Sequence, residues 1–325
     1  MKKPTKARKH GGKKQYKVRN WREYNQALVD RGKIIFWVTD EALRQWREQK
    51  KTGKRGKPRL YSNLAIETAL TLGQVFHIPL RQVEGFLGSI LLKMGSVNKS
   101  PDYSTLSVRA ENLSVSIRVR SVPDEPLHIV VDSTGAKVYG EGEWKVRQHG
   151  WSKRRTWQKL HLGIDEKTGD ILLGEVTGND TADCEVLPSL LAQVPAETKI
   201  VQVSADGAYD KRICYEALKK RVVNQIAIPP QRNARIIEHG NSSAPPFARD
   251  ENLRRIRRVG RKRWKEEVGY HRRSLAENAM FRLKTIFTDK VRSRKKGIER
   301  VELLIRVRAL NLMTTLGMPK SYVVA

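Results

Sequence analysis

Two aspartates, Asp132 and Asp206, each come directly after a short apolar run that is predicted to be a buried strand. The runs are residues 127–131 and 200–205, and their length and flanking residues favour strands over helices. Each carboxylate is therefore expected at the carboxyl end of a strand, where open α/β sheets collect their ligands. Either aspartate alone is better explained as a turn residue that caps the following segment. Two such carboxylates in one sheet would repel each other, and a divalent cation would remove that cost, so the pair suggests a metal site.

A third carboxylate, Glu277, lies in a long helix predicted over about residues 265–286. Tyr270, Arg273, Glu277 and Lys284 stand at offsets of three, seven and fourteen from the first. At about 100° per residue, all four lie within roughly 60° of one another on one helix face. A polar stripe opposite an apolar one is also the ordinary appearance of a surface helix. That interpretation would be preferred if the helix stood alone.

The charge of the chain points to a polyanionic partner. Its 325 residues include 64 Lys and Arg against 34 Asp and Glu, a formal net charge of +30. Such an excess repels itself in a compact state. Nucleic acid is the leading candidate, because duplex DNA releases condensed counterions when basic side chains bind it. An anionic membrane surface and ribosomal RNA are the alternative partners. The sequence contains no run of about 18 apolar residues, so no membrane-spanning helix is predicted.

The N-terminal third is predicted to be helical and to form a domain of its own. Residues 1–19 are a basic tail, interpreted equally well as a solvated extension or as a DNA-contacting arm. Residues 20–122 are predicted to be all-helical. The helices that resemble a DNA-reading unit are predicted over residues 62–75, 80–94 and 103–113. Their order is that of helix-turn-helix proteins, with Thr105 and Arg109 as candidate DNA contacts, although many three-helix bundles look alike and bind nothing.

From residue 123 the pattern changes from helical to strand-like, and residues 123–318 are predicted to be an α/β domain. Strands are predicted over residues 127–131, 155–164, 171–176, 199–204 and 225–228, and helices over residues 183–193, 211–221 and 265–286. Antiparallel strands followed by alternating strands and helices imply a mixed sheet with helices on its faces.

A basic and aromatic hairpin is predicted around residues 147–159. Its cationic and aromatic members are Arg147, Lys153, Arg154, Arg155 and Lys159, with Trp151 and Trp157 between them. This composition is typical of a DNA-contacting ribbon, although a solvated charged ribbon explains any single residue equally well. His149 and His161 lack the spacing of zinc ligands, so we interpret them as phosphate or core contacts. Trp264 is expected in the core, with stacking on an unpaired base as the alternative.

Several of these motifs together resemble the DDE transposases of bacterial insertion sequences. The resemblance rests on VVDST around Asp132, SADGAYD around Asp206, and the spaced set Tyr270, Arg273, Glu277 and Lys284. Residues 144–165 and 20–32 further resemble the insertion-sequence-five group, within the branch that carries this Tyr-Arg-Glu-Lys signature. The likeness extends from about residue 20 to residue 317. Val108 departs from it, since a further basic residue is expected there.

The resemblance implies a ribonuclease-H-like fold for the sheet domain. It also implies two Mg²⁺ ions, or Mn²⁺, in each active site, held by Asp132, Asp206 and Glu277. The implied enzyme is a metal-dependent DNA transposase that binds the ends of its insertion sequence, hydrolyses phosphodiester bonds there and joins the 3′-hydroxyl ends to target DNA. Its partner would be double-stranded DNA in the cytoplasm, at the nucleoid. Joining two ends favours a homodimer on DNA.

The resemblance also gives roles to the other residues of the late helix. Arg273 and Lys284 would hold DNA phosphates near the cut, with Tyr270 packed alongside. The main alternative function is a non-catalytic, sequence-specific DNA-binding protein, either a regulator or a transposase remnant. A remnant has no reason to retain three carboxylates in position, which argues against it. An RNA-binding protein would account for the charge but not for the carboxylates.

Overall fold

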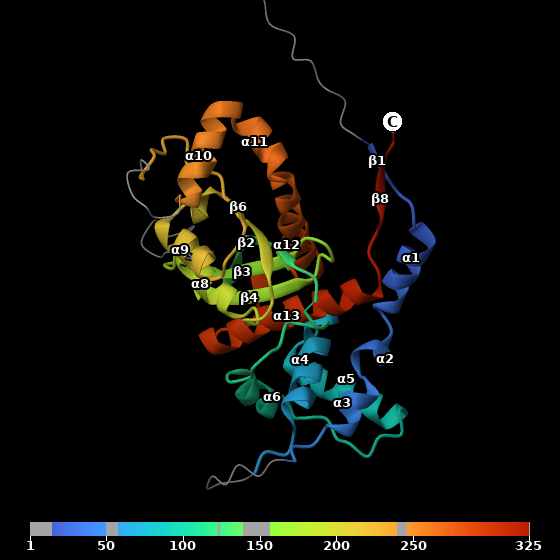
Figure 1. Cartoon of the computed structure of the whole chain (residues 1–325). Helices are drawn as coiled ribbons and strands as arrows, with labels where there is room; N and C mark the ends of the chain where they lie inside the picture. The colour runs from blue at the N-terminus through green and yellow to red at the C-terminus, as the bar shows by residue number, and fades with distance from the viewer. Residues whose placement is uncertain (1–14, 50–57, 123, 139–156, 239–245, 325) are drawn as a thin grey trace, which may run out of the picture.

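A six-stranded mixed sheet forms the centre of the fold in the computed structural model, which describes residues 15–49, 58–122, 124–138, 157–238 and 246–324 (Figure 1). The strands are β2 (Leu127–Val138), β3 (Trp157–Asp165), β4 (Ile171–Gly178), β5 (Ile200–Ser204), β6 (Gln225–Ala227) and β7 (Lys290–Val291). Their order is β4-β3-β2-β5-β6, and β7 pairs with the far end of β2. β3 is antiparallel to its neighbours, whereas β5 and β7 are parallel to β2. The predicted mixed sheet is confirmed.

Helices cover both faces of this sheet. Successive residues of a strand point to opposite faces, so Ile129 and Val131 belong to one hydrophobic core and Val130 to another. The first core includes residues of α8 (Asp183–Ala192) and α9 (Arg212–Lys220). The second includes residues of α12 (Ser274–Phe287) and α13 (Lys296–Leu316). The strand that carries Asp132 is therefore held rigidly from both sides.

A helical part precedes the sheet in the chain, and most of it lies below the sheet in Figure 1. Its helices are α1 (Trp21–Asp30), α2 (Ile34–Trp37), α3 (Asp40–Arg44), α4 (Asn63–Val75), α5 (Leu80–Lys93) and α6 (Tyr103–Ala110). The Ser62 hydroxyl caps α4 by accepting a hydrogen bond from the Ala65 N–H at 3.1 Å, as Ser at this position is expected to do. Ala65 to Gly73 are buried without interruption, because α4 packs between α5, α6 and α13. The helical part and the sheet thus share one core.

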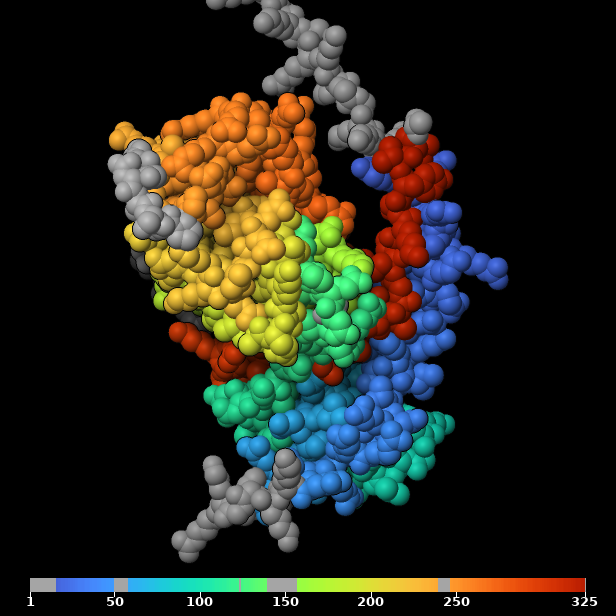
Figure 2. Space-filling model, in the orientation of Figure 1, coloured from blue at the N-terminus to red at the C-terminus, as the bar shows by residue number. Residues whose placement is uncertain are grey.

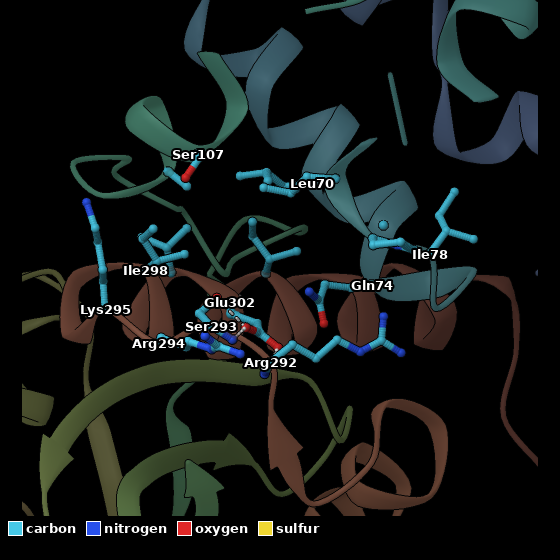
Figure 3. A pocket seen from close by; sticks show the side chains of 16 residues that line it. Leu70, Gln74, Ile78, Ser107, Arg292, Ser293, Arg294, Lys295, Ile298 and Glu302 are labelled. Atoms are coloured by element: carbon cyan, nitrogen blue, oxygen red, sulfur yellow. Dashed lines mark hydrogen bonds between the residues drawn. The ribbon is translucent and has the colours of Figure 1, made fainter. Parts of the chain in front are cut away.

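A cavity of about 370 Å³ lies in the seam between α4 and the start of α13 (Figure 3). Its lining combines apolar residues of both helices and of the loop after α4 with basic residues that precede α13: Leu70, Ile78, Ile298, Val301, Arg292 and Lys295. Beside it, the buried Arg306 donates to Glu302 Oε1 at 2.5 Å and to Gln74 Oε1 at 2.9 Å. The seam is therefore fixed by polar bonds as well as by apolar packing.

The first and last described strands pair with each other. β1 (Gln15–Val18) and β8 (Ser321–Val324) are antiparallel, with Tyr16 opposite Val323. The Asn20 side chain continues this link, because it accepts a hydrogen bond from Lys320 N at 2.7 Å and donates to the Met318 carbonyl at 3.0 Å. Figure 2 shows the ribbon standing clear of the α11 segment. The end of the predicted basic tail is thus a strand.

The late helix predicted over residues 265–286 is not continuous. It is divided into α11 (Arg261–Glu267), the 3-10 turn η2 (Tyr270–Arg273) and α12, and α10 (Ala248–Val259) precedes them. Gly269 ends α11 with a φ of +63°, a left-handed conformation that glycine adopts readily. Tyr270 and Arg273 therefore precede the helix that carries Glu277 and Lys284. No helix among the described residues is long and apolar enough to cross a membrane.

Candidate active site

Asp132 and Asp206 come level with each other on neighbouring parallel strands. β2 and β5 pair with Val130 opposite Ser204, and each aspartate is two residues further along its chain. Register in a parallel pair fixes which residues are neighbours. The two carboxylates are close enough that the charge of Asp206 influences the pKa of Asp132. The sheet therefore brings together two residues that are distant in sequence.

The two aspartates differ in how their strands end. Asp206 does follow β5, and it caps the 3-10 turn η1 (Gly207–Tyr209) by accepting a hydrogen bond from Ala208 N at 2.9 Å. Asp132 is not at a strand end, and that prediction was wrong. β2 continues to Val138 because residues 133–137 pair with β3. Asp132 thus lies within a central strand, with its side chain 14% exposed.

Arg273 links Asp132 to the third predicted carboxylate, Glu277. Its Nη1 donates to Asp132 Oδ2 at 2.7 Å, and its Nη2 donates to Glu277 Oε1. Arg273 is 21% exposed, whereas the Glu277 side chain is 55% exposed. Glu277 lies in the first turn of α12, one helical turn after Arg273. The guanidinium thus joins the central strand to the start of this helix.

The pKa of Asp132 reflects both its burial and the charges around it. Burial raises the pKa of Asp132, and the negative charges of Asp206 and Glu277 add to this effect. The Ser133 N–H, which donates to Asp132 Oδ1 at 2.9 Å, and the charge of Arg273 oppose it. Burial on its own would lower the pKa of Arg273, but the surrounding acidic groups raise it. The site is therefore built to hold a positive charge among carboxylates.

Tyr270 packs beside this cluster, within an aromatic and cationic layer. Its ring lies 6.2 Å from that of Trp264, and the Lys265 ammonium lies 4.8 Å from the Tyr270 ring centroid. The Arg273 guanidinium is 5.9 Å from the same centroid. Trp264 is 1% exposed and donates to Asn252 Oδ1 at 3.3 Å. Trp264 is therefore the core residue that was expected, not a free stacking platform.

Two family models described as "Transposase DDE domain" match the chain, one over residues 29–141 and the other over residues 123–312. The second match covers more than half of the chain and contains all three carboxylates. The chain belongs to the DDE transposase family. The matches do not separate the insertion-sequence-five group or its signature branch from other members, so that finer assignment stays a prediction. A solved structure, the synaptic complex of piggyBac transposase with hairpin DNA, is similar at 12% identity and a TM-score of 0.37, over 88% of this chain and 73% of that one.

The other candidate DNA contacts of this transposase have hydrogen-bond partners within the protein. Arg109 donates to the Tyr61 carbonyl and to Asn63 Oδ1, both at 2.7 Å. Thr105 bonds with the N-cap residue Asp102 at the start of α6. Lys159 donates to the Thr181 carbonyl at 2.8 Å, near the start of α8. Each of these contacts positions a helix of the transposase.

Most of the predicted basic hairpin lies outside the described residues. The predicted contacts concerned are Arg147, His149, Trp151, Lys153, Arg154 and Arg155. Of the flanking strand, His161 is fully buried and shares a hydrogen bond of 2.9 Å with Thr177 Oγ1. Burial lowers the pKa of His161 and favours its neutral form. His161 is thus a core residue of the transposase.

Sequence reasoning missed Tyr209, three residues after Asp206. Tyr209 is 1% exposed, and burial together with the charges of Asp183, Asp132 and Asp206 raises its pKa far above the ordinary value. Its hydroxyl is buried and has no hydrogen-bond partner among the described residues. The Tyr209 phenol is therefore neutral and lies buried beside the two aspartates. The sequence did contain a signal for it, because Tyr209 is an aromatic residue in the turn that directly follows the candidate ligand Asp206.

Proposed function

We propose that this transposase binds the ends of its element, hydrolyses phosphodiester bonds there and joins the 3′-hydroxyl ends to target DNA. In this proposal Asp132, Asp206 and Glu277 are ligands of divalent metal ions. The observation that carries it is the register of β2 and β5, which brings two aspartates level, together with the Arg273 link from Asp132 to Glu277.

The chemistry of the three carboxylates fits such ions. Hard carboxylate oxygens are preferred ligands of Mg²⁺ and Mn²⁺, and DDE transposases generally use divalent metal ions. Two of the three carboxylates already share a cation, the Arg273 guanidinium. Among the described residues, no three acidic, histidine or cysteine side chains stand close enough together to hold one ion. Two Mg²⁺ ions per site, if bound there, would activate the attacking oxygen and stabilise the leaving oxygen.

The remaining residues of the site would prepare the DNA for this reaction. Arg273 and Lys284, which lie on either side of Glu277 along the chain, would bind phosphates near the cut, where a fixed positive charge offsets the negative charge of the transition state. Tyr270 packs against Trp264 and so supports the turn that carries Arg273. Tyr209 would exclude bulk water from behind the two aspartates, because its ring is buried there.

Sequence-specific binding is proposed for the helical part, residues 20–122, and catalysis for residues 123–318. The net charge of +30 supports a duplex partner. Since Arg109 and Thr105 already bond within the protein, any DNA contact they make would add to these bonds or replace them. Joining two ends to one target favours a homodimer on DNA.

Isosteric substitutions of the carboxylates test the proposal. Asp132→Asn, Asp206→Asn and Glu277→Gln should each reduce Mg²⁺-dependent cleavage of supercoiled DNA that carries the element's ends below detection, while gel-shift affinity for those ends stays near wild type. Glu166→Gln is the control, because Glu166 pairs with Arg272 outside the cluster. Wild-type cleavage by any one of the three variants refutes the metal assignment. A wild-type protein that binds the ends and cuts with neither Mg²⁺ nor Mn²⁺ supports the non-catalytic alternative.

A further inference from the structure

We infer that Arg273 occupies the metal-binding position of the DNA-free transposase as a resident cation, and that the site binds its ions only weakly until a DNA phosphate has taken Arg273 away. This inference rests on the proposed function, because it describes how the same site is kept closed. It makes the DNA substrate a condition for tight metal binding.

The contacts of Arg273 are the first support. Two different nitrogens of one guanidinium bond to two different carboxylates, Asp132 and Glu277. Arginine presents its donors in a fixed planar fork, so this arrangement sets the spacing of both acids at once. Asp132 has no idle oxygen, since Oδ1 accepts the Ser133 N–H and Oδ2 accepts Arg273. An ion that bound Asp132 would need an oxygen that already accepts a hydrogen bond, and at Oδ2 that bond comes from Arg273.

Competition between the two cations follows from their charges. A divalent ion at the carboxylates would lie within a few ångströms of the guanidinium, in a site where Asp132 is 14% exposed and solvent screens poorly. Like charges at that distance repel strongly, so the site favours one occupant or the other. Arginine keeps its proton throughout the physiological range, so pH does not remove it.

The backbone around Arg273 allows it to change partners. Arg273 is the last residue of the 3-10 turn η2, which starts after the left-handed Gly269, and it directly precedes α12. Glu277 and Asp132, by contrast, lie in a regular helix and a central strand. Arg273 can therefore move while its two acidic partners stay in position.

A DNA phosphate is the partner that the chemistry selects. Phosphate and carboxylate both offer two oxygens that match the guanidinium fork. When the DNA backbone reaches the site, Arg273 can exchange carboxylate oxygens for phosphate oxygens without losing a charged partner. Asp132 and Glu277 then become available as ligands next to the phosphate that is to be cut. In the absence of DNA the transposase would hold its catalytic ions weakly.

Mn²⁺ binding to the full-length, DNA-free protein tests this order directly. We expect Arg273→Gln to bind Mn²⁺ about tenfold more tightly than wild type in isothermal titration calorimetry, within the range that neighbours of a metal site command. Arg272→Gln is the matched control. It removes the same charge one residue away, where the partner is Glu166, and should leave Mn²⁺ affinity unchanged. Equal affinity of Arg273→Gln and wild type overturns the inference.

Two further variants separate this inference from the proposed function. Asp132→Asn should abolish Mn²⁺ binding at the site, and if it binds as wild type does, the proposed metal site itself is wrong. If Asp132→Asn loses binding while Arg273→Gln gains none, the metal site stands and the resident-cation role fails. Arg273→Lys keeps the charge but cannot bond both acids with a fork, so it should show a smaller gain and decides the question if the glutamine variant does not fold.

Discussion

Two arginines of this transposase each pair with a glutamate four residues away, yet they serve different ends. Arg306, in the seam beneath the helical part, bonds Glu302 and also Gln74 and the Lys290 carbonyl. Glu302 in turn accepts backbone N–H groups of Arg292 and Ser293, both at 3.0 Å.

Arg273 differs in the kind of partner that it has. Its guanidinium donates to two acids of the site, Asp132 and Glu277, and lies 5.9 Å from the Tyr270 ring centroid. The Arg306–Glu302 pair also bonds backbone groups and so helps to hold the fold together. The Arg273–Glu277 pair forms among candidate metal ligands, so a DNA phosphate or a metal ion can separate it. Four predictions test this distinction.

The framework pair should give the largest effect on stability. Glu302→Ala leaves Arg306, 1% exposed, as a buried charge without its acid, and such losses cost about 3–5 kcal/mol of unfolding free energy. Chemical denaturation measures it. The exposed pair of the same spacing, Arg212 with Glu216, is the control, and Glu216→Ala should cost less than about 0.5 kcal/mol. If both variants lost the same unfolding free energy, the Gln74 and Lys290 carbonyl oxygens alone would be sufficient partners for Arg306.

The active-site arginine should affect catalysis more than stability. Arg273→Ala and Lys284→Ala should slow cleavage of bound DNA by about 100-fold, equivalent to about 3 kcal/mol of transition-state stabilisation. Affinity for intact ends should change little, since one phosphate contact adds about one unit to the salt slope. Gel shifts and single-turnover cleavage, measured side by side with Arg272→Ala as the control, test this. Weakened binding with normal cleavage of the bound complex would show that these residues serve DNA binding and not catalysis.

Arg109 sharpens the comparison within the helical part. Its two bonds tie α6 to the start of α4, so Arg109→Ala should cost about 1.5–3 kcal/mol of unfolding free energy, the usual contribution of hydrogen bonds to a charged group. Denaturation and end-specific gel shifts of the same variant decide its role. Loss of specific DNA binding with unchanged stability would identify Arg109 as a DNA contact, as its sequence position suggests.

The smallest effect is expected in the pH dependence of Asp132. Burial raises its pKa, so the folded state favours the protonated carboxyl. The resulting stability is present below the ordinary aspartate pKa of about 4 and is lost as pH rises through the raised value. Asp132→Asn, which is always neutral, should therefore have a higher Tm than wild type at pH 7, and the difference should vanish near pH 3. A lower Tm at pH 7 would show that the Arg273 bond outweighs the cost of burial.

Local patterns were sufficient to predict much of this architecture. The apolar runs before Asp132 and Asp206 predicted both strands, and the change of period near residue 123 predicted where the sheet begins. The Ser62 cap predicted the start of α4. In each case the signal lies within a few residues of the feature.

Features that depend on distant partners could not be read in the same way. β2 extends past Asp132 because β3 pairs with residues that carry no strand signal of their own, Ser133-Thr134-Gly135. The bond from Arg273 to Glu277 follows from helical spacing, but the bond to Asp132 spans 141 positions. The break at Gly269 had a local signal, a glycine in the predicted helix, that was outweighed by the polar stripe around it.

The β1–β8 ribbon has a mechanical consequence. Gln15 pairs with Val324 at one end of the ribbon, and Val18 pairs with Ser321 at the other. A force that pulls Gln15 and Val324 apart therefore separates the strands from that end. Peeling breaks one pair of residues at a time, and an isolated two-stranded ribbon resists it weakly. The Asn20 bonds to Met318 and Lys320 would yield next, before the buried α13 takes any load. Under tension, this transposase should therefore lengthen first by a short, reversible step while its catalytic sheet stays folded.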